Sequence, residues 1–98
     1  MKYLVSDIGN TTTRICILNN KYLIEKSFIF QTKKIFEKKF IKKIMRRLIS
    51  ENLNTKILFS SVVPKAFNEI KKAFKNTRFK ILEIKDLKIK RIIKINIK

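Results

Sequence analysis

Two short segments near the start of the chain have the pattern of strands, and in the second of them Thr13, Ile15 and Ile17 alternate with Arg14, Cys16 and Leu18. Residues Lys2–Asp7 predict a short buried strand, and Thr12–Leu18 predict a second one. Asparagine tolerates left-handed backbone angles, so Asn19-Asn20 suits a two-residue hairpin turn. A third strand follows at about Lys21–Phe30. These three strands are expected to form an antiparallel meander.

The pattern changes to a helical one from residue 35 onward. Apolar residues recur at helical spacing and fall on one stripe: Ile35-Phe36, Phe40-Ile41, Ile44-Met45 and Leu48-Ile49. Basic residues occupy the other side of the same helix: Lys38, Lys39, Lys42, Lys43, Arg46 and Arg47. This basic face could touch phosphates, but a solvated surface is the favoured interpretation. The segment 51–55 breaks the pattern, and Lys56–Ser60 predicts a return to a strand.

Pro64, the single proline, opens a second predicted helix, where its fixed φ is tolerated. The buried stripe of that helix is expected to be Ala66, Phe67, Ile70, Ala73 and Phe74. A strand at about Phe79–Ile84 follows, and the alternation in Leu87–Lys98 predicts an edge strand or hairpin arm. The order β-β-β-α-β-α-β predicts an α/β fold with a mixed sheet, in which α-connected parallel strands follow three antiparallel strands. That is the order of the ribonuclease-H-like half-domain of actin, hexokinase and Hsp70-type ATPases.

Length and composition limit the kind of protein. A chain of 98 residues is enough for one domain. No apolar run approaches the roughly 20 residues of a membrane-spanning helix, and the apolar stretch before Asp7 is too short for a signal peptide. One cysteine and no histidine exclude an internal disulfide and argue against a zinc site. We therefore expect a reduced, cytoplasmic protein with no membrane partner.

The formal net charge of +18 is the strongest compositional signal. Such a charge favours polyanion binding, because lysine and arginine displace counterions from phosphates. Over-use of Lys, Ile, Asn and Phe together is also typical of AT-rich codons, and the lysines are spread from Lys2 to Lys98. Codon composition is the preferred explanation of the charge, so nucleic acid is not the expected partner.

The single glycine lies in the stretch Asp7–Arg14, "DIGNTTTR", between the first two predicted strands. Gly9 would allow close approach of a ligand, and unpaired amides and side-chain donors of Asn10–Thr12 could cradle phosphate oxygens. Asp7 could hold a hydrated Mg²⁺, and Arg14 would lie near the phosphates. An ordinary Asx-type turn explains the same letters without a ligand. The residues alone leave both explanations open.

The stretch "DIGNTTTR" resembles the ATP-phosphate motif of type III pantothenate kinases, and "SSVVP", Ser60–Pro64, resembles that family's second N-terminal signature. The resemblance implies ATP binding by Asp7, Ile8, Gly9, Asn10, Thr11, Thr12, Thr13 and Arg14, with Asp7 on the metal side. Ser60–Pro64 would shape the floor of the cleft as a structural element. The implied reaction is phosphoryl transfer from ATP to pantothenate, the first committed step toward coenzyme A. The implied cofactors are Mg²⁺ and a monovalent cation (K⁺ or NH4⁺), and the family works as homodimers.

Members of that family are more than twice as long and have two half-domains, with substrates in the cleft between them. Their pantothenate site and general base lie in a later G-A-D-R motif, expected beyond Lys98. Residues 1–98 are therefore expected to form a single N-terminal actin-like ATPase half-domain, with the second half-domain absent and no useful kinase activity alone. Pantothenate would bind only if a complementing C-terminal half were supplied. A truncated product, a split enzyme and a fragment remain open, as do a small basic nucleic-acid-binding module and a non-catalytic remnant.

Overall fold

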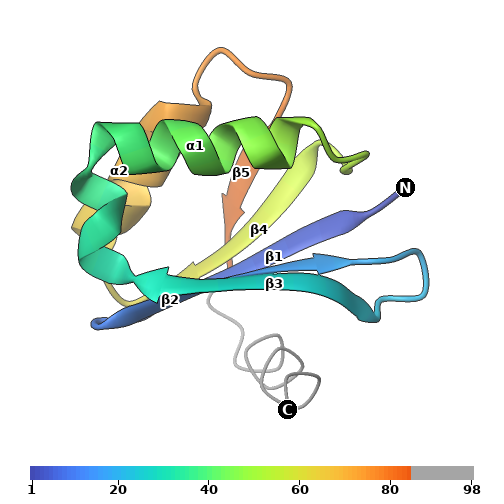
Figure 1. Cartoon of the computed structure of the whole chain (residues 1–98), viewed down its shortest axis with the longest axis horizontal. Helices are drawn as coiled ribbons and strands as arrows, with labels where there is room; N and C mark the ends of the chain where they lie inside the picture. The colour runs from blue at the N-terminus through green and yellow to red at the C-terminus, as the bar shows by residue number, and fades with distance from the viewer. Residues whose placement is uncertain (85–98) are drawn as a thin grey trace.

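The computed structural model describes residues 1–84, so the arm predicted at Leu87–Lys98 lies outside the described residues. The described chain forms a five-stranded mixed sheet with two α-helices (Figure 1). Its elements are β1 (Tyr3–Ile8), β2 (Thr12–Leu18), β3 (Ile24–Gln31), the 3₁₀-helix η1 (Thr32–Phe36), α1 (Lys38–Ile49), β4 (Lys56–Ser61), α2 (Pro64–Phe74) and β5 (Lys80–Glu83). The predicted order of strands and helices is confirmed.

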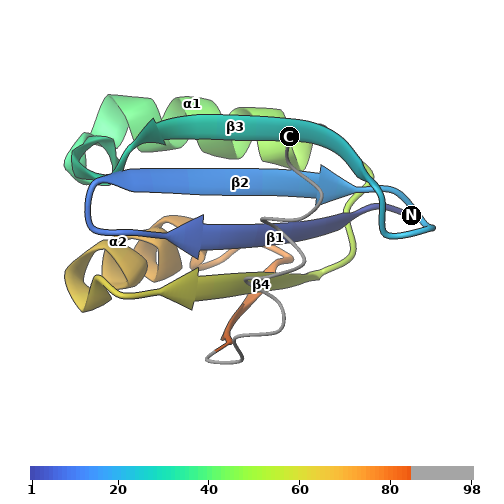
Figure 2. The same ribbon diagram turned by 90° about the horizontal axis from the view of Figure 1, so that it is seen from below.

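The strands lie in the order β3-β2-β1-β4-β5. β1 pairs antiparallel with β2, which pairs antiparallel with β3, whereas β4 lies parallel to β1 and to β5. Both α-helices cover the same face of the sheet, and Figure 2 shows the opposite face in front of them. The β1–β2 hairpin, the end of β4 and the start of α2 therefore meet at one edge of the sheet. The mixed, ribonuclease-H-like α/β architecture predicted from the pattern is confirmed.

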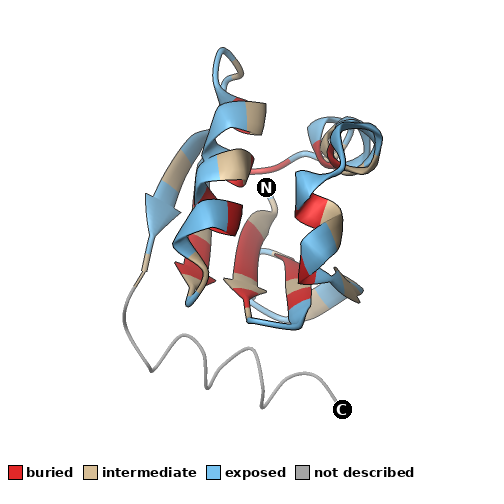
Figure 3. Ribbon diagram, turned by 90° about the vertical axis from the view of Figure 1, so that its left-hand side faces the viewer, coloured by how far each residue is buried: buried red, intermediate tan, exposed pale blue. Residues whose placement is uncertain are grey.

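The main core lies between the sheet and the helices, where the buried sides of the helices face the strands (Figure 3). Alternate strand residues point to the helices, so Leu4 and Ile8 of β1 and Phe59 of β4 are fully buried. Leu48 of α1 and Phe67 of α2 are buried against this layer at helical spacing. Most of each predicted apolar stripe therefore packs against the sheet, but Phe36 and Ile49 of the first stripe are exposed, at 50% and 43%.

The first helical stretch is interrupted, which corrects the continuous pattern expected from Ile35. Residues Thr32–Phe36 form the separate 3₁₀-helix η1, and Glu37 is extended with φ −92° and ψ 112° before α1 begins. Ile35 is buried in the same core as α1. Tertiary packing accounts for the break, because the start of η1 is hydrogen-bonded to the β1–β2 hairpin and α1 must turn away from that point to lie along the sheet.

The turn between β2 and β3 also differs from the predicted two-residue Asn19-Asn20 turn. The backbone of Asn19 pairs with Leu23, and the left-handed residue of the loop is Tyr22, with φ 63°. The Asn19 side chain accepts hydrogen bonds from the amides of Lys21 and Leu23, and the Tyr22 ring lies 5.2 Å from the ring of Tyr3. Side-chain capping by Asn19 therefore stabilises a longer loop, and β3 starts later than predicted.

Candidate functional site

The hairpin tip, Gly9–Thr12, joins β1 and β2 at the edge where β4 ends. The side chains of Asn10, Thr11 and Thr12 are all exposed. The amide of Gly9 donates to the carbonyl oxygen of Thr12 at 3.0 Å. A Cβ atom at Gly9 would lie 2.9 Å from that same carbonyl oxygen, so the turn itself needs glycine at this position. The tip is open to a ligand, and a side chain at its first position would force the backbone of the turn to shift.

Thr32, at the start of η1, holds the tip from the core side and was not singled out by the sequence. Its amide donates to the Thr11 carbonyl at 2.8 Å, and its hydroxyl donates to the Gly9 carbonyl at 2.7 Å. The Thr13 hydroxyl lies 2.9 Å from that of Thr32. Because the single Thr32 hydroxyl proton goes to Gly9, Thr13 is the donor of this pair. No sequence signal could have found Thr32, because its role depends on contacts with the distant β1–β2 hairpin.

The register of the sheet divides the predicted ATP-contacting residues between its two faces. Ile8 and Thr13 are paired across the hairpin, point toward the helices and are fully buried. Asp7 pairs with Arg14 of β2 and with Ser60 of β4, so these three residues form one row on the opposite face, named here the Asp7 row. Asp7 and Arg14 are partly exposed. Asp7, Gly9–Thr12 and Arg14 remain placed for ligand contact, whereas the side chains of Ile8 and Thr13 support the turn.

A shallow depression of about 240 Å³ lies beside the hairpin tip. Asn10 and Thr11 of the tip line it together with Gln31 and Lys33, which follow from the end of β3. Lys33 adds a positive charge next to the exposed amide and hydroxyl groups. Its proximity was not foreseen, because it depends on where β3 ends relative to the hairpin.

The "SSVVP" stretch makes the turn from β4 into α2. The Ser61 hydroxyl accepts from the Val63 amide at 3.0 Å, and the Val62 amide donates to the Ile8 carbonyl at 3.0 Å. Pro64 lies in the first turn of α2, as predicted. This stretch therefore fixes the end of β4 beside the end of β1, next to the hairpin tip.

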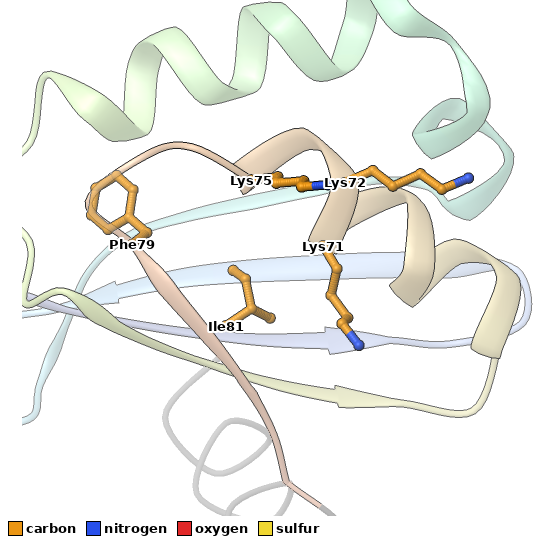
Figure 4. Close-up of a pocket in the computed structure, with 5 residues that line it drawn as sticks. All are labelled: Lys71, Lys72, Lys75, Phe79 and Ile81. Carbon is orange, nitrogen blue, oxygen red and sulfur yellow. The ribbon is translucent and has the colours of Figure 1, made fainter.

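A second cavity, of about 360 Å³, lies between α2 and β5 (Figure 4). Its walls are Lys71, Lys72 and Lys75 over the side chains of Phe79 and Ile81. The ammonium groups of Lys71 and Lys72 point in different directions in Figure 4. The Lys71 ammonium group lies over the Phe67 ring, 5.5 Å from its centre, and the Lys72 ammonium group lies 3.6 Å from the Glu69 carboxylate. The lysines do not converge on one point, so this cavity is not built as an anion site.

The acidic residues of the site are few. Within residues 1–84, no cluster of three or more histidine, cysteine or acidic side chains is placed to hold a metal ion. Asp7 is the only carboxylate in β1, the hairpin tip and β4. One partly exposed carboxylate suits a hydrated Mg²⁺, which keeps several waters and takes one or two carboxylates when phosphates complete its shell. No helix of the described chain is long and apolar enough to cross a bilayer.

The sheet order, with both helices on one face, defines the class: a ribonuclease-H-like α/β half-domain. A family model described as type III pantothenate kinase matches residues 3–98. The type III pantothenate kinase of Pelagibacter ubique (strain HTCC1062) is 41% identical over 95 residues. The chain belongs to the type III pantothenate kinase family. The matched region covers 96% of this chain and 38% of the Pelagibacter protein.

Two solved structures of Aquifex aeolicus proteins are similar in shape to the chain. The PPX-GPPA enzyme has a TM-score of 0.44 at 14% identity, over 86% of this chain and 36% of that one. A second structure of the Aquifex aeolicus member of the Ppx/GppA family has a TM-score of 0.43 at 15% identity, over 86% of this chain and 35% of that one.

Proposed function

We propose that this chain binds the phosphates of ATP as the N-terminal half-domain of a type III pantothenate kinase. That enzyme would transfer the γ-phosphoryl group of ATP to the hydroxyl of pantothenate, in the synthesis of coenzyme A. Membership of the family supports this proposal. The single observation that carries it is the open hairpin tip, whose exposed residues lie at the same sheet edge as the Asp7 carboxylate.

Each part of the tip has a distinct role in this proposal. Exposed backbone amides and the side chains of Asn10–Thr12 hydrogen-bond phosphate oxygens, and Gly9 keeps the turn tight enough to present them. Asp7 holds the water shell of Mg²⁺, and Arg14 adds positive charge on the same face. A bound Mg²⁺ would neutralise charge on the β- and γ-phosphates. Phosphoryl transfer depends chiefly on such positioning and charge stabilisation.

The acceptor side of the reaction is proposed to come from a C-terminal half-domain. Asp7 is the only carboxylate of the site in β1, the tip and β4, and its proposed work is to hold the metal. A separate base and a pantothenate pocket are then required, and we expect residues 1–98 alone to be inactive. A monovalent cation and a homodimer belong to the proposal through the family resemblance alone, and a cytoplasmic location stays a prediction.

A binding titration tests the nucleotide half of the proposal. ATP is titrated into the chain with and without Mg²⁺ at physiological salt, for the wild type and for Asp7→Asn. Asp7→Asn removes one negative charge from a chain whose net charge is already +18. If ATP bound only nonspecifically, through the positive charge of the chain, this substitution would make binding tighter. Specific binding through Asp7 predicts the opposite, a weaker affinity that no longer depends on Mg²⁺.

Glu37→Gln is the matched control, because Glu37 is exposed and changes the net charge by the same amount. It should leave Mg²⁺-dependent ATP binding unchanged. Equal behaviour of the Asp7→Asn and Glu37→Gln variants would contradict an ATP site at Asp7.

A complementation assay tests the kinase half. The chain is mixed with the portion of the Pelagibacter protein that lies beyond the matched region, and formation of phosphopantothenate is measured with ATP and Mg²⁺. We expect product only when both parts are present. Neither product nor tighter nucleotide binding on mixing would contradict a split active site.

Nucleic-acid binding is the second candidate function, supported by one observation. All six basic residues of the predicted α1 face are exposed, and a shallow depression is lined by Lys39, Lys42, Lys43 and Arg46. Arg47 is partly engaged, since its guanidinium lies 4.5 Å from the centre of the Phe28 ring. Affinity for RNA or DNA that is tighter than micromolar at physiological salt would favour this function. An affinity that is micromolar or weaker would mean that the charge reflects composition and not function.

A further inference from the structure

Ser60, the last but one residue of β4, has a buried hydroxyl with no hydrogen-bond partner within the described chain. The residue is only 2% exposed. Buried side-chain hydroxyls normally have a hydrogen-bond partner, so a buried hydroxyl that lacks a partner needs an explanation. The neighbouring Ser61 gives a contrast, because its hydroxyl is engaged in the turn with Val63. The two serines point to opposite faces of the sheet, and only the Ser61 hydroxyl has a role in the fold.

The sheet register places Ser60 directly beside Asp7. The two residues pair across the parallel β1–β4 ladder, and neighbouring strands lie about 4.8 Å apart. Arg14 pairs with Asp7 from the other side, and its Nε atom is also buried without a partner. Two hydrogen-bond donors that lack acceptors in the described chain therefore flank one carboxylate along the Asp7 row.

We propose that Ser60 is a positioning residue for Asp7, an inference that rests on the proposed function. The Ser60 hydroxyl donates to one oxygen of the Asp7 carboxylate when ATP and Mg²⁺ bind. The other oxygen is then fixed toward the water shell of the metal. Carboxylates that serve a metal are in turn hydrogen-bonded, and losing that support weakens metal affinity by about tenfold or more. The first serine of "SSVVP" thereby gains a role in ligand binding, and the second keeps a purely structural one.

The test measures ATP affinity of the full 98-residue chain with and without Mg²⁺, for Ser60→Ala, Ser60→Thr and Ser61→Ala. Ser60→Ala is expected to weaken Mg²⁺-dependent ATP binding about tenfold and to leave Mg²⁺-free binding within twofold. Ser60→Thr keeps a hydroxyl and should restore much of the loss. Urea unfolding is expected to find Ser60→Ala as stable as the wild type, because no hydrogen bond of the free protein is removed. Ser61→Ala should instead lower stability and leave the effect of Mg²⁺ intact.

A double-mutant cycle checks that Ser60 acts through Asp7. In the Asp7→Asn background, Ser60→Ala should cause no further loss of affinity, because the group it positions is already changed. An unchanged Mg²⁺-dependent affinity in Ser60→Ala, or an equal loss with and without Mg²⁺, would overturn the inference and leave the ATP site standing. A wild-type chain without Mg²⁺-dependent ATP binding would overturn the proposed function, and this inference with it.

Discussion

The hydroxyl of Thr32 donates a hydrogen bond to the carbonyl oxygen of Gly9, with 2.7 Å between the two oxygens. This bond joins the start of η1 to the first residue of the hairpin tip, and the Thr13 hydroxyl extends it as a donor to Thr32. Thr13 and Thr32 are buried, at 0% and 3% exposure. A buried chain of hydroxyls therefore holds the rigid side of a turn whose other side is open to solvent.

Replacing Thr32 with valine should destabilise the hairpin tip. Valine has nearly the same shape but neither donates nor accepts, so the Gly9 carbonyl and the Thr13 hydroxyl both lose their partner. We expect a loss of about 1–3 kcal/mol in the free energy of unfolding, measured by urea denaturation, and weaker ATP binding. Thr32→Ser keeps the hydroxyl and should lose only about 0.8 kcal/mol for the missing methyl group. Equal losses in the two variants would show that the hydrogen bonds contribute little.

Replacing Gly9 with alanine should strain the turn. The new Cβ would lie 2.9 Å from the Thr12 carbonyl oxygen, a backbone atom that cannot move without opening the hairpin. We expect about 1–3 kcal/mol of destabilisation in thermal or urea unfolding. Asn10→Ala, at the exposed neighbouring position, should stay within about 0.5 kcal/mol of the wild type. A Gly9→Ala variant of wild-type stability would indicate that glycine serves ligand approach alone.

Glu51 should make stability depend on pH in the acid range. Hydrogen bonds from Lys26 and Lys2 to its carboxylate, at 2.5 Å and 3.3 Å, hold the pKa of Glu51 below its usual 4.5. Its charged form is therefore favoured in the folded protein. That contribution is present above the unfolded-state pKa and is lost as pH falls through the lower folded-state pKa.

Glu51→Gln should accordingly be less stable than the wild type at pH 7, and the gap should close in acid. Urea unfolding at a series of pH values from neutral to acid measures this. Glu83→Gln is the control, because Glu83 is exposed and has no ion pair within residues 1–84. If the difference in free energy of unfolding between the wild type and Glu51→Gln is the same at every pH, the ion pairs of Glu51 do not set the pH dependence.

Cys16 should resist alkylation in the folded chain. Its thiol is fully buried in β2, and loss of hydration raises the pKa of Cys16, although the nearby Arg14 charge opposes this. The thiolate is the reactive form, so both burial and the raised pKa slow the reaction. Iodoacetamide should modify the native chain roughly a hundredfold more slowly than the urea-unfolded chain. Similar rates in the two states would show that the centre of the sheet opens readily.

Much of the fold could be predicted from the sequence, because local patterns determined it. β2 has the predicted bounds, and α2 begins at Pro64 as expected. The break at Glu37 was not predictable, because it results from contacts with a distant segment. The loop around the left-handed Tyr22 differs from the predicted turn because the Asn19 side chain caps a longer loop. The stretch Asp7–Arg14 was located correctly as the β1–β2 hairpin and its flanks, whereas ATP contact by these residues stays a prediction.

The sequence by itself determined the order of elements, the buried stripes of the helices and the position of the single glycine at a tight turn. These follow from periodicity and from backbone sterics, which act over a few residues. Only the tertiary structure decided that Thr32 holds the hairpin tip and that Arg14, Asp7 and Ser60 form one row. Both depend on the register between strands and on bonds between segments far apart in the chain. A single-residue slip of β2 or β4 would turn Arg14 or Ser60 away from the face of Asp7. The pairing that prevents such a slip forms only when the buried faces of the strands pack together.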